Sequence, residues 1–144
     1  MYTVCKSFKI PVGHRLSKHS GRCYNFHGHN IKIDVTVSRE KLNHCDMVID
    51  FYDLKTIVNK IIDEWDHALI LNKKDFELNF SIIKENKDQR KIYMENGDPT
   101  SENMCFTLFH LLRGQLKEFD KDLRLKSIQI WESDESYAKY ESDI

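Results

Sequence analysis

Three histidines and one cysteine in the first thirty residues have the types and spacing of a metal site. His27 and His29 flank Gly28 and lead into I-K-I-D-V-T-V, where apolar and polar residues alternate. Side chains two residues apart in a strand point to the same face, so both imidazoles are expected beside the aliphatic row that faces the core. Buried polar groups need partners, and a metal ion is a partner that accepts both imidazoles.

His14 follows a strand-like run and can supply a third nitrogen, while Cys23 lies on the connecting loop. Three histidine ligands suit zinc, and an open fourth position would make the site catalytic. If Cys23 is instead the fourth ligand, the site is closed and structural. A lone His-x-His pair is more often two surface or capping histidines, but the shared core face and the nearby His14 and Cys23 favour a metal.

Other charged side chains are weaker candidates for binding or catalytic residues. Arg15, Lys18 and Arg22 lie on the same loop and could receive an anion, although ordinary surface charge is the slightly better explanation for each of them. In Asp66-His67, the carboxylate could orient the imidazole and raise its basicity. Adjacent residues rarely bond each other through their side chains, however, so this pair taken alone is interpreted as the end of a helix.

Composition limits the classes of protein that the chain can represent. Its 144 residues, 40% of them hydrophobic, suffice for one domain with a core, which we place at residues 1–144. The formal net charge of −1 argues against a nucleic-acid partner. There is no run long enough to cross a membrane, no signal peptide and no CxxC pair among the four cysteines, so a cytoplasmic protein with reduced thiols is expected.

Alternating patterns predict the strands that must position these residues. The first strand is expected from Tyr2 to Ile10, where Pro11 ends it, and the second from His29 to Ser38, antiparallel to the first. Two further strands are expected at 125–132 and 137–140. The charged stretch 73–96 is interpreted as a surface excursion with a possible short strand at 92–94.

Two amphipathic helices are expected between the second and third strands. Asp50 caps the first, which stops near Asp66, and Thr100 or Ser101 caps the second. The apolar faces of the two helices are expected at Phe51, Leu54, Ile57, Val58, Ile61, Ile62 and Trp65, and at Met104, Cys105, Leu108, Leu111, Leu112, Leu116 and Phe119. The predicted fold class is α+β, with both helices on one face of an antiparallel four-stranded sheet.

Taken in order, the motifs of the chain resemble the 6-pyruvoyl-tetrahydropterin synthase superfamily over nearly its whole length. The motifs are G-H-R-L around His14, C-Y-N-F-H-G-H at Cys23 to His29, M-V-I-D-F-Y-D-L-K at Met47 to Lys55, W-D-H at Trp65 to His67, P-T-S-E-N at Pro99 to Asn103 and I-W-E at Ile130 to Glu132. The three residues between Cys23 and His27 are similar to the spacing of the 6-carboxy-tetrahydropterin synthase branch.

The resemblance implies roles for individual residues. It implies that His14, His27 and His29 bind zinc (Zn2+), and that Cys23 is the catalytic base or nucleophile, working with Asp66 and His67. It implies that Glu132 anchors a pterin ring. The P-T-S-E-N motif places Thr100 and Ser101 with the substrate-binding residues.

The resemblance also implies a T-fold, in which subunits join their sheets into a barrel with the sites between them. The homo-oligomer is expected to be a hexamer, as a dimer of trimers, or a tetramer. The implied reaction converts 7,8-dihydroneopterin triphosphate to 6-carboxy-5,6,7,8-tetrahydropterin with release of acetaldehyde and triphosphate, in queuosine biosynthesis. The alternatives are formation of 6-pyruvoyl-tetrahydropterin, with the carbon chain kept, and a non-catalytic zinc protein.

Overall fold

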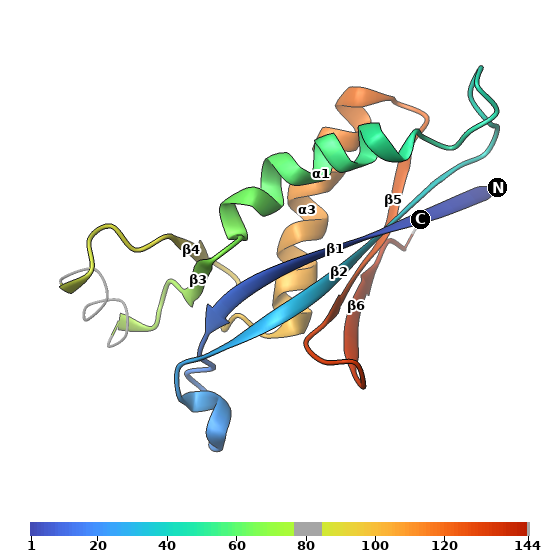
Figure 1. The fold of residues 1–144 in the computed structure, drawn as a ribbon. Coiled ribbons are helices and arrows are strands. Elements are labelled where there is room, and N and C mark those ends of the chain that lie inside the picture. The colour runs from blue at the N-terminus through green and yellow to red at the C-terminus, as the bar shows by residue number, and fades with distance from the viewer. Residues whose placement is uncertain (77–84, 144) are drawn as a thin grey trace.

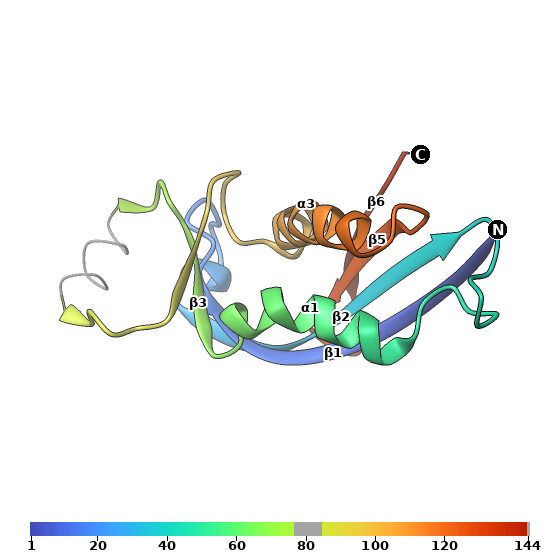
Figure 2. The ribbon, with the colours of Figure 1, turned by 90° about the horizontal axis from the view of Figure 1, so that it is seen from above.

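A six-stranded mixed sheet with two helices on its concave side forms the described part of the chain (Figures 1 and 2). The computed structural model describes residues 1–76 and 85–143. Strands are hydrogen-bonded in the order β4-β3-β1-β2-β5-β6. The elements are β1 (Tyr2–His14), β2 (His27–Arg39), α1 (Phe51–Trp65), β3 (Ala68–Asn72), β4 (Lys91–Met94), α3 (Ser101–Phe119), β5 (Arg124–Trp131) and β6 (Tyr137–Glu141).

The long hairpin of β1 and β2 confirms the predicted antiparallel pair and its buried face. Its register runs from Tyr2 opposite Arg39 to His14 opposite His27. Every second side chain of β2 faces the helices, and the four aliphatic ones are fully buried: Ile31, Ile33, Val35 and Val37, each 0% exposed. The histidines therefore continue a core-facing row, as the alternation predicts.

The prediction that Pro11 ends the first strand is wrong, because β1 continues to His14. The carbonyl of Pro11 accepts a hydrogen bond from the backbone N–H of His67, so this residue turns its polar groups away from β2. Proline lacks an N–H, and at this position the missing donor removes no bond of the β1–β2 ladder. Pairing with β3 begins only at Val12, one residue later.

The predicted four-stranded antiparallel sheet is also incomplete. The four strands exist and are antiparallel, but β3 and β4 add to the β1 edge in parallel orientation. The segment 68–72 is short and apolar without alternation, which does not distinguish a buried strand from the end of a helix. Of the predicted excursion at 73–96, residues 91–94 form β4, and residues 77–84 lie outside the described residues.

Both helices begin where the capping residues predict. The Asp50 carboxylate accepts from the Tyr52 N–H, and the Thr100 hydroxyl accepts from the Asn103 N–H. The core-facing stripes are confirmed except at their margins, where three predicted core side chains are about half exposed: Phe51 (50%), Leu111 (47%) and Phe119 (51%). Among the described residues, no helix is long and apolar enough to span a membrane.

Candidate metal centre and active site

The loop end of the β1–β2 hairpin brings the three predicted metal ligands together. The register sets His14 directly opposite His27, and His29 follows on the same face of β2. One ring nitrogen of each lies within 4.8 Å of the others. His14 is 1% exposed, whereas His27 and His29 are half-buried. The predicted histidine cluster is therefore present.

Hydrogen bonds to backbone carbonyls fix the tautomers of His14 and His27. Nδ1 of His14 lies 2.7 Å from the carbonyl oxygen of Pro99, and Nδ1 of His27 lies 2.7 Å from that of Asn25. A carbonyl only accepts, so both Nδ1 atoms carry the proton and, in a neutral ring, both Nε2 atoms are bare. Metal-binding histidines are oriented in this way, with the second ring nitrogen donating to a carbonyl or carboxylate.

The unprotonated Nε2 atoms of His14 and His27 can only accept, and a cation can satisfy both. Nε2 of His14 lies 3.0 Å from Nε2 of His27, and two lone pairs at this distance repel each other. Nε2 of His29 is buried and has no hydrogen-bond partner among the residues that the structure describes. A tetrahedral zinc ion with Zn–N bonds of about 2.0–2.1 Å separates two ligand nitrogens by about 3.3 Å. The His14–His27 separation is therefore close to that of two ligands of one metal ion.

The pKa of His14 is lowered from its ordinary value, chiefly because burial disfavours the charged ring. The hydrogen bond to Pro99 and the charge of Glu132 oppose this effect, while His27 and His29 add to it. The ring is consequently neutral around neutral pH, which leaves Nε2 available as a metal ligand.

Glu132 points its carboxylate at the histidines. It follows the last residue of β5 and shares the strand parity of Ile128 and Ile130, which are fully buried. Its two oxygens lie 4.0 Å and 3.8 Å from the Nε2 atoms of His14 and His29. The prediction that this side chain faces inward is confirmed. A carboxylate this close adds negative charge to the site, which favours a bound cation.

Two cavities adjoin the cluster. One, of about 240 Å³, is lined by Glu132, Thr100 and Ser101, three residues predicted to bind substrate. The other, of about 310 Å³, is lined by His29 and His67. A cavity of about 610 Å³ contains none of the predicted site residues and is lined instead by Lys9, Ile10, Pro11, Asn30, Lys32, Trp131, Ser133 and Asp134.

Asp66 and His67 lie at the end of a helix, as interpreted from the sequence, and their neighbouring side chains nevertheless bond each other. Nδ1 of His67 lies 2.6 Å from a carboxylate oxygen of Asp66. His67 has a φ of 59°, in the left-handed region that few non-glycine residues adopt, and its N–H is held by the Pro11 carbonyl. This turn makes room for the bond between neighbouring side chains. Within the described part of the chain, Nε2 of His67 has no hydrogen-bond partner, and the side chain is 77% exposed, in the arrangement of a general base.

Cys23 is not a member of the histidine cluster. It occupies a single 3-10 turn, Arg22–Tyr24, on the β1–β2 loop, and its side chain is half-buried. Among the described residues, no hydrogen bond or ion pair joins Cys23 to His67, Asp66 or the histidine cluster. The described contacts of one subunit therefore join the predicted metal ligands to the predicted pterin anchor and Asp66 to His67, but they do not join Cys23 to either group.

The three basic residues of the loop differ in their contacts and exposure. Arg15 donates two hydrogen bonds to Asp75, at 2.7 Å and 2.5 Å, and its guanidinium lies 4.8 Å from the centre of the Tyr24 ring. Lys18 and Arg22 are exposed. Lys18 and Arg22 are therefore better placed than Arg15 to receive a phosphate group.

Sequence reasoning missed the groups that orient the ligands. The carbonyls of Pro99 and Asn25 fix the rings of His14 and His27. A backbone carbonyl has no signature in the sequence, because every residue carries one. Pro99 belongs to the P-T-S-E-N motif, which was singled out for its side chains alone.

Comparison with known proteins agrees with the geometry. The family model for 6-pyruvoyl tetrahydropterin synthase matches residues 3–143. The chain is 32% identical over 148 residues to the 6-carboxy-5,6,7,8-tetrahydropterin synthase of Haemophilus influenzae, and the match covers 98% of this chain and 99% of the relative.

Solved structures show the same fold. An uncharacterised protein from Wolinella succinogenes has a TM-score of 0.81 at 22% identity, covering 99% of this chain and 98% of that one. The 6-pyruvoyl tetrahydropterin synthase of Caenorhabditis elegans has a TM-score of 0.70 at 21% identity, covering 99% and 96%. At these identities the likeness establishes the architecture alone.

Proposed function

The chain belongs to the 6-pyruvoyl tetrahydropterin synthase family, and from this premise we propose that it is a zinc-dependent 6-carboxy-tetrahydropterin synthase. The reaction would convert 7,8-dihydroneopterin triphosphate and water to 6-carboxy-5,6,7,8-tetrahydropterin, acetaldehyde and triphosphate. The observation that carries the proposal is the convergence of three imidazoles, with one nitrogen of each within 4.8 Å of the others, beside Glu132. The relative of the same name at 32% identity supports this branch of the family.

His14, His27 and His29 would hold the zinc ion. When bound, zinc acts as a Lewis acid that polarises oxygens of the substrate side chain and stabilises developing negative charge. The carbonyls of Pro99 and Asn25 keep the rings of His14 and His27 in the ligating tautomer.

Glu132 would anchor the pterin. Adjacent N–H groups on the pyrimidine edge of a pterin match the two oxygens of one carboxylate, in the manner of a bidentate pair. Thr100 and Ser101 line the same cavity and would supply further polar contacts. The hydroxyl of Thr100 already caps α3, so it would reach a ligand mainly as a donor.

Cys23 and His67 would move the protons. Cleavage of the side chain with reduction of the ring requires a base at a side-chain carbon and an acid at the ring. His67 is poised for this work because Asp66 holds its Nδ1–H and leaves Nε2 free. Cys23 would act as a thiolate, the reactive form of the side chain.

The separation of these two groups supports a homo-oligomer with sites between subunits. β4 and β6 form the two edges of the described sheet, and an exposed edge is a template for pairing with another chain. Subunits that joined their edges would form the barrel of a T-fold and could bring His67 of one copy to Cys23 of the next. We further propose that residues 1–144 form one domain. The protein would be cytoplasmic, act in queuosine biosynthesis and have no nucleic-acid partner.

Two alternatives are distinguished by specific features. Formation of 6-pyruvoyl-tetrahydropterin would use the same metal and acid–base groups but would keep the carbon chain. A structural zinc protein would need a fourth protein ligand, and the cluster of three histidines does not include Cys23. A zinc ion held by three histidines keeps an open fourth coordination position, which favours the catalytic alternative.

Product identification tests the proposal. The zinc-loaded protein is incubated with 7,8-dihydroneopterin triphosphate, and the pterin product is identified by mass. We expect the mass of the carboxy-pterin. The mass of the pyruvoyl product would assign the chain to the other branch, and no conversion at all would favour the structural alternative.

A further inference from the structure

The β1–β2 loop, residues 15–26, carries Cys23 between the two strands that hold the metal ligands. Within the loop, the Leu16 N–H donates to the Cys23 carbonyl at 2.8 Å, and the Tyr24 N–H donates to Gly21. These bonds shape the loop but do not attach it to the rest of the protein. Its position relative to the histidines therefore depends on contacts that leave the loop.

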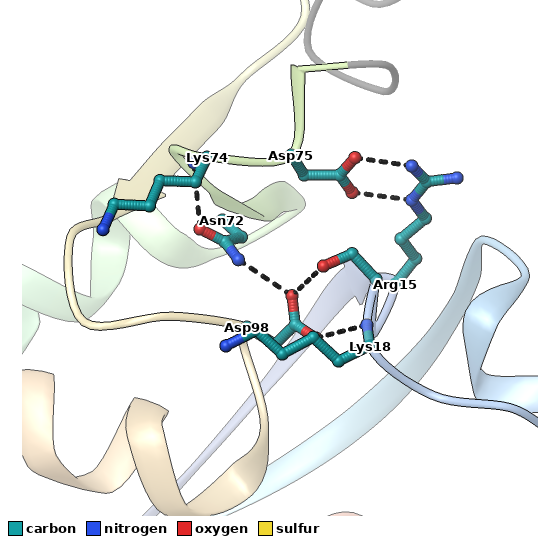
Figure 3. Close-up of polar contacts among 7 residues, drawn as sticks. Arg15, Lys18, Asn72, Lys74, Asp75 and Asp98 are labelled. Atoms are coloured by element: carbon teal, nitrogen blue, oxygen red, sulfur yellow. Dashed lines mark hydrogen bonds and ion pairs between the residues drawn. The ribbon is translucent and has the colours of Figure 1, made fainter.

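The carboxylate of Asp98 makes such contacts with the first half of the loop (Figure 3). It accepts from the Ser17 hydroxyl at 2.5 Å and from the Lys18 backbone N–H at 2.9 Å. Asp98 is 6% exposed and reaches the loop from more than 80 positions away in the sequence. Hydrogen bonds to an ionised acceptor are stronger than those between neutral groups, and burial excludes competing water.

Asp98 is itself held rigidly. Nδ2 of Asn72, the last residue of β3, donates to its carboxylate at 2.9 Å. The Thr100 N–H and the Asn103 side-chain amide both donate to its backbone carbonyl. Gly97, just before it, has φ +124°, where L side chains are strained. The side chain and the backbone of Asp98 are therefore both held by residues outside the loop.

Pro99, the next residue, connects Asp98 to the metal centre. Pro99 accepts from Nδ1 of His14 and fixes its ring, so Asp98 and Pro99 form one short segment that contacts both the loop and a metal ligand. Any displacement of the segment would alter the two together.

We infer that Asp98 is a positioning residue that sets the β1–β2 loop, and with it Cys23, at a fixed distance from the histidine site. This inference rests on the proposed function for the catalytic role of Cys23. Arg15 also tethers the loop through Asp75, but it directly follows His14, whose position β1 already fixes. Asp98 contacts the loop further along, at Ser17 and Lys18, and so constrains the part that leads to Cys23.

Two substitutions of Asp98 separate its contacts. In Asp98→Asn, either orientation of the new amide turns its NH2 group towards one N–H donor, that of Lys18 or that of Asn72. In Asp98→Ala, all three carboxylate contacts are lost. Ser17→Ala removes one contact and leaves the buried carboxylate in place. Asp34→Asn is the matched control, because the Asp34 carboxylate also accepts three hydrogen bonds, from Ser7, Gln129 and Trp131, but none of these residues belongs to the loop.

Three readouts are taken on the zinc-loaded protein. Amide hydrogen exchange follows the Leu16 and Lys18 N–H groups, alkylation of Cys23 is quantified by peptide mass, and kcat and KM are measured with 7,8-dihydroneopterin triphosphate. For Asp98→Asn and Asp98→Ala we expect exchange at Lys18 and Leu16 about tenfold faster or more and an altered Cys23 alkylation rate. We expect kcat lower by about tenfold or more, with KM within about threefold.

A purely structural role predicts a different pattern. It would lower the melting temperature, as is also expected for Asp34→Asn, and would leave exchange at Leu16, whose N–H does not contact Asp98, unchanged. It would also not lower kcat while KM stays constant. If Asp98→Ala loses zinc or fails to fold, Ser17→Ala decides, because it must still speed exchange at Lys18. Unchanged protection at Lys18 and Leu16 in Ser17→Ala and in every folded Asp98 variant overturns the inference.

Failure of the proposed function gives a distinct result. If the parent protein does not convert the pterin, or if Cys23→Ala remains active, the catalytic assignment is wrong. Exchange and alkylation still report whether Asp98 holds the loop.

Discussion

The Nε2 atoms of His14 and His27 face each other at 3.0 Å, and the Nδ1–H of each ring is donated to a backbone carbonyl. Neither nitrogen can donate to the other in its neutral form, and a cation between them would remove the repulsion of their lone pairs. The protein thus fixes the tautomers of both rings through Pro99 and Asn25. These two carbonyls make the hairpin end a ligand set for a metal ion.

Replacing Cys23 by Ala separates a catalytic thiol from a structural ligand. Cys23 is not part of the histidine cluster, so we expect zinc content to stay at the parent level. Turnover is expected to fall by about 10²–10⁴-fold, the range for a lost proton-transfer group. Metal analysis and steady-state kinetics check both expectations. Loss of zinc together with thermal stability would instead identify a closed four-ligand site, since structural zinc contributes directly to folding.

Asp66→Asn tests whether the bond between neighbouring side chains tunes His67. An amide can turn its NH2 group towards Nδ1, which would stabilise the tautomer with the proton on Nε2 and remove the free base. We expect kcat to fall by about 10²-fold or more with zinc content unchanged. The pH–rate profile provides the check, because the limb that reports the base should shift or disappear. A profile and kcat equal to those of the parent would exclude His67 as a base oriented by Asp66.

Glu132→Gln tests the pterin anchor. The substitution keeps the shape but turns one acceptor into a donor that faces a pterin N–H. Leaving a partly buried donor mispaired is expected to weaken pterin binding by about 1–3 kcal/mol. Titration calorimetry with a non-reactive pterin measures the loss, and zinc content is followed in parallel. Pterin affinity within twofold of the parent contradicts the anchoring role, whereas a loss of zinc would make Glu132 a ligand instead.

The hydrogen bonds that the Asp98 carboxylate accepts should be weakened only in acid. Burial acts to raise the pKa of Asp98, but hydrogen bonds from Ser17, Asn72 and Lys18 outweigh it, so the pKa lies below the ordinary value of 3.8. A carboxyl group with a lowered pKa in the folded state stabilises the protein above its unfolded pKa and loses this contribution as the pH falls through the folded value.

The stability difference between the parent and Asp98→Asn should therefore be constant between about pH 5 and pH 8 and shrink below about pH 4. Urea unfolding of both proteins across this range measures it. A difference that grew as the pH fell would show that the carboxylate is not the stabilised form.

Much of the metal site follows from the sequence because strand parity is a strict rule. His27 and His29 continue the row of Ile31 and Ile33, and this alone places both imidazoles on the core face. The helix boundaries were predictable for a similar reason, since Asp50 and Thr100 act through local hydrogen bonds.

Other features depend on contacts that the local sequence does not encode. Pro11 remains inside a strand because its neighbour on one side is the turn at His67. The bond between Asp66 and His67 requires the left-handed backbone of His67, which no residue preference at that position predicts. The contact of Asp98 with Lys18 joins a turn to a loop 80 positions away. Such relationships arise only once the sheet is assembled.

Turnover as a function of zinc tests the central claim most directly. The protein is stripped with a chelator, reloaded with one zinc ion per chain, and mixed with 7,8-dihydroneopterin triphosphate while acetaldehyde and the pterin product are quantified. We predict no acetaldehyde from the stripped protein, and acetaldehyde equimolar with 6-carboxy-tetrahydropterin after reloading, an effect absent in His29→Ala. Equal acetaldehyde release with and without zinc, or pterin turnover by the zinc-loaded protein without any acetaldehyde, would contradict the assignment.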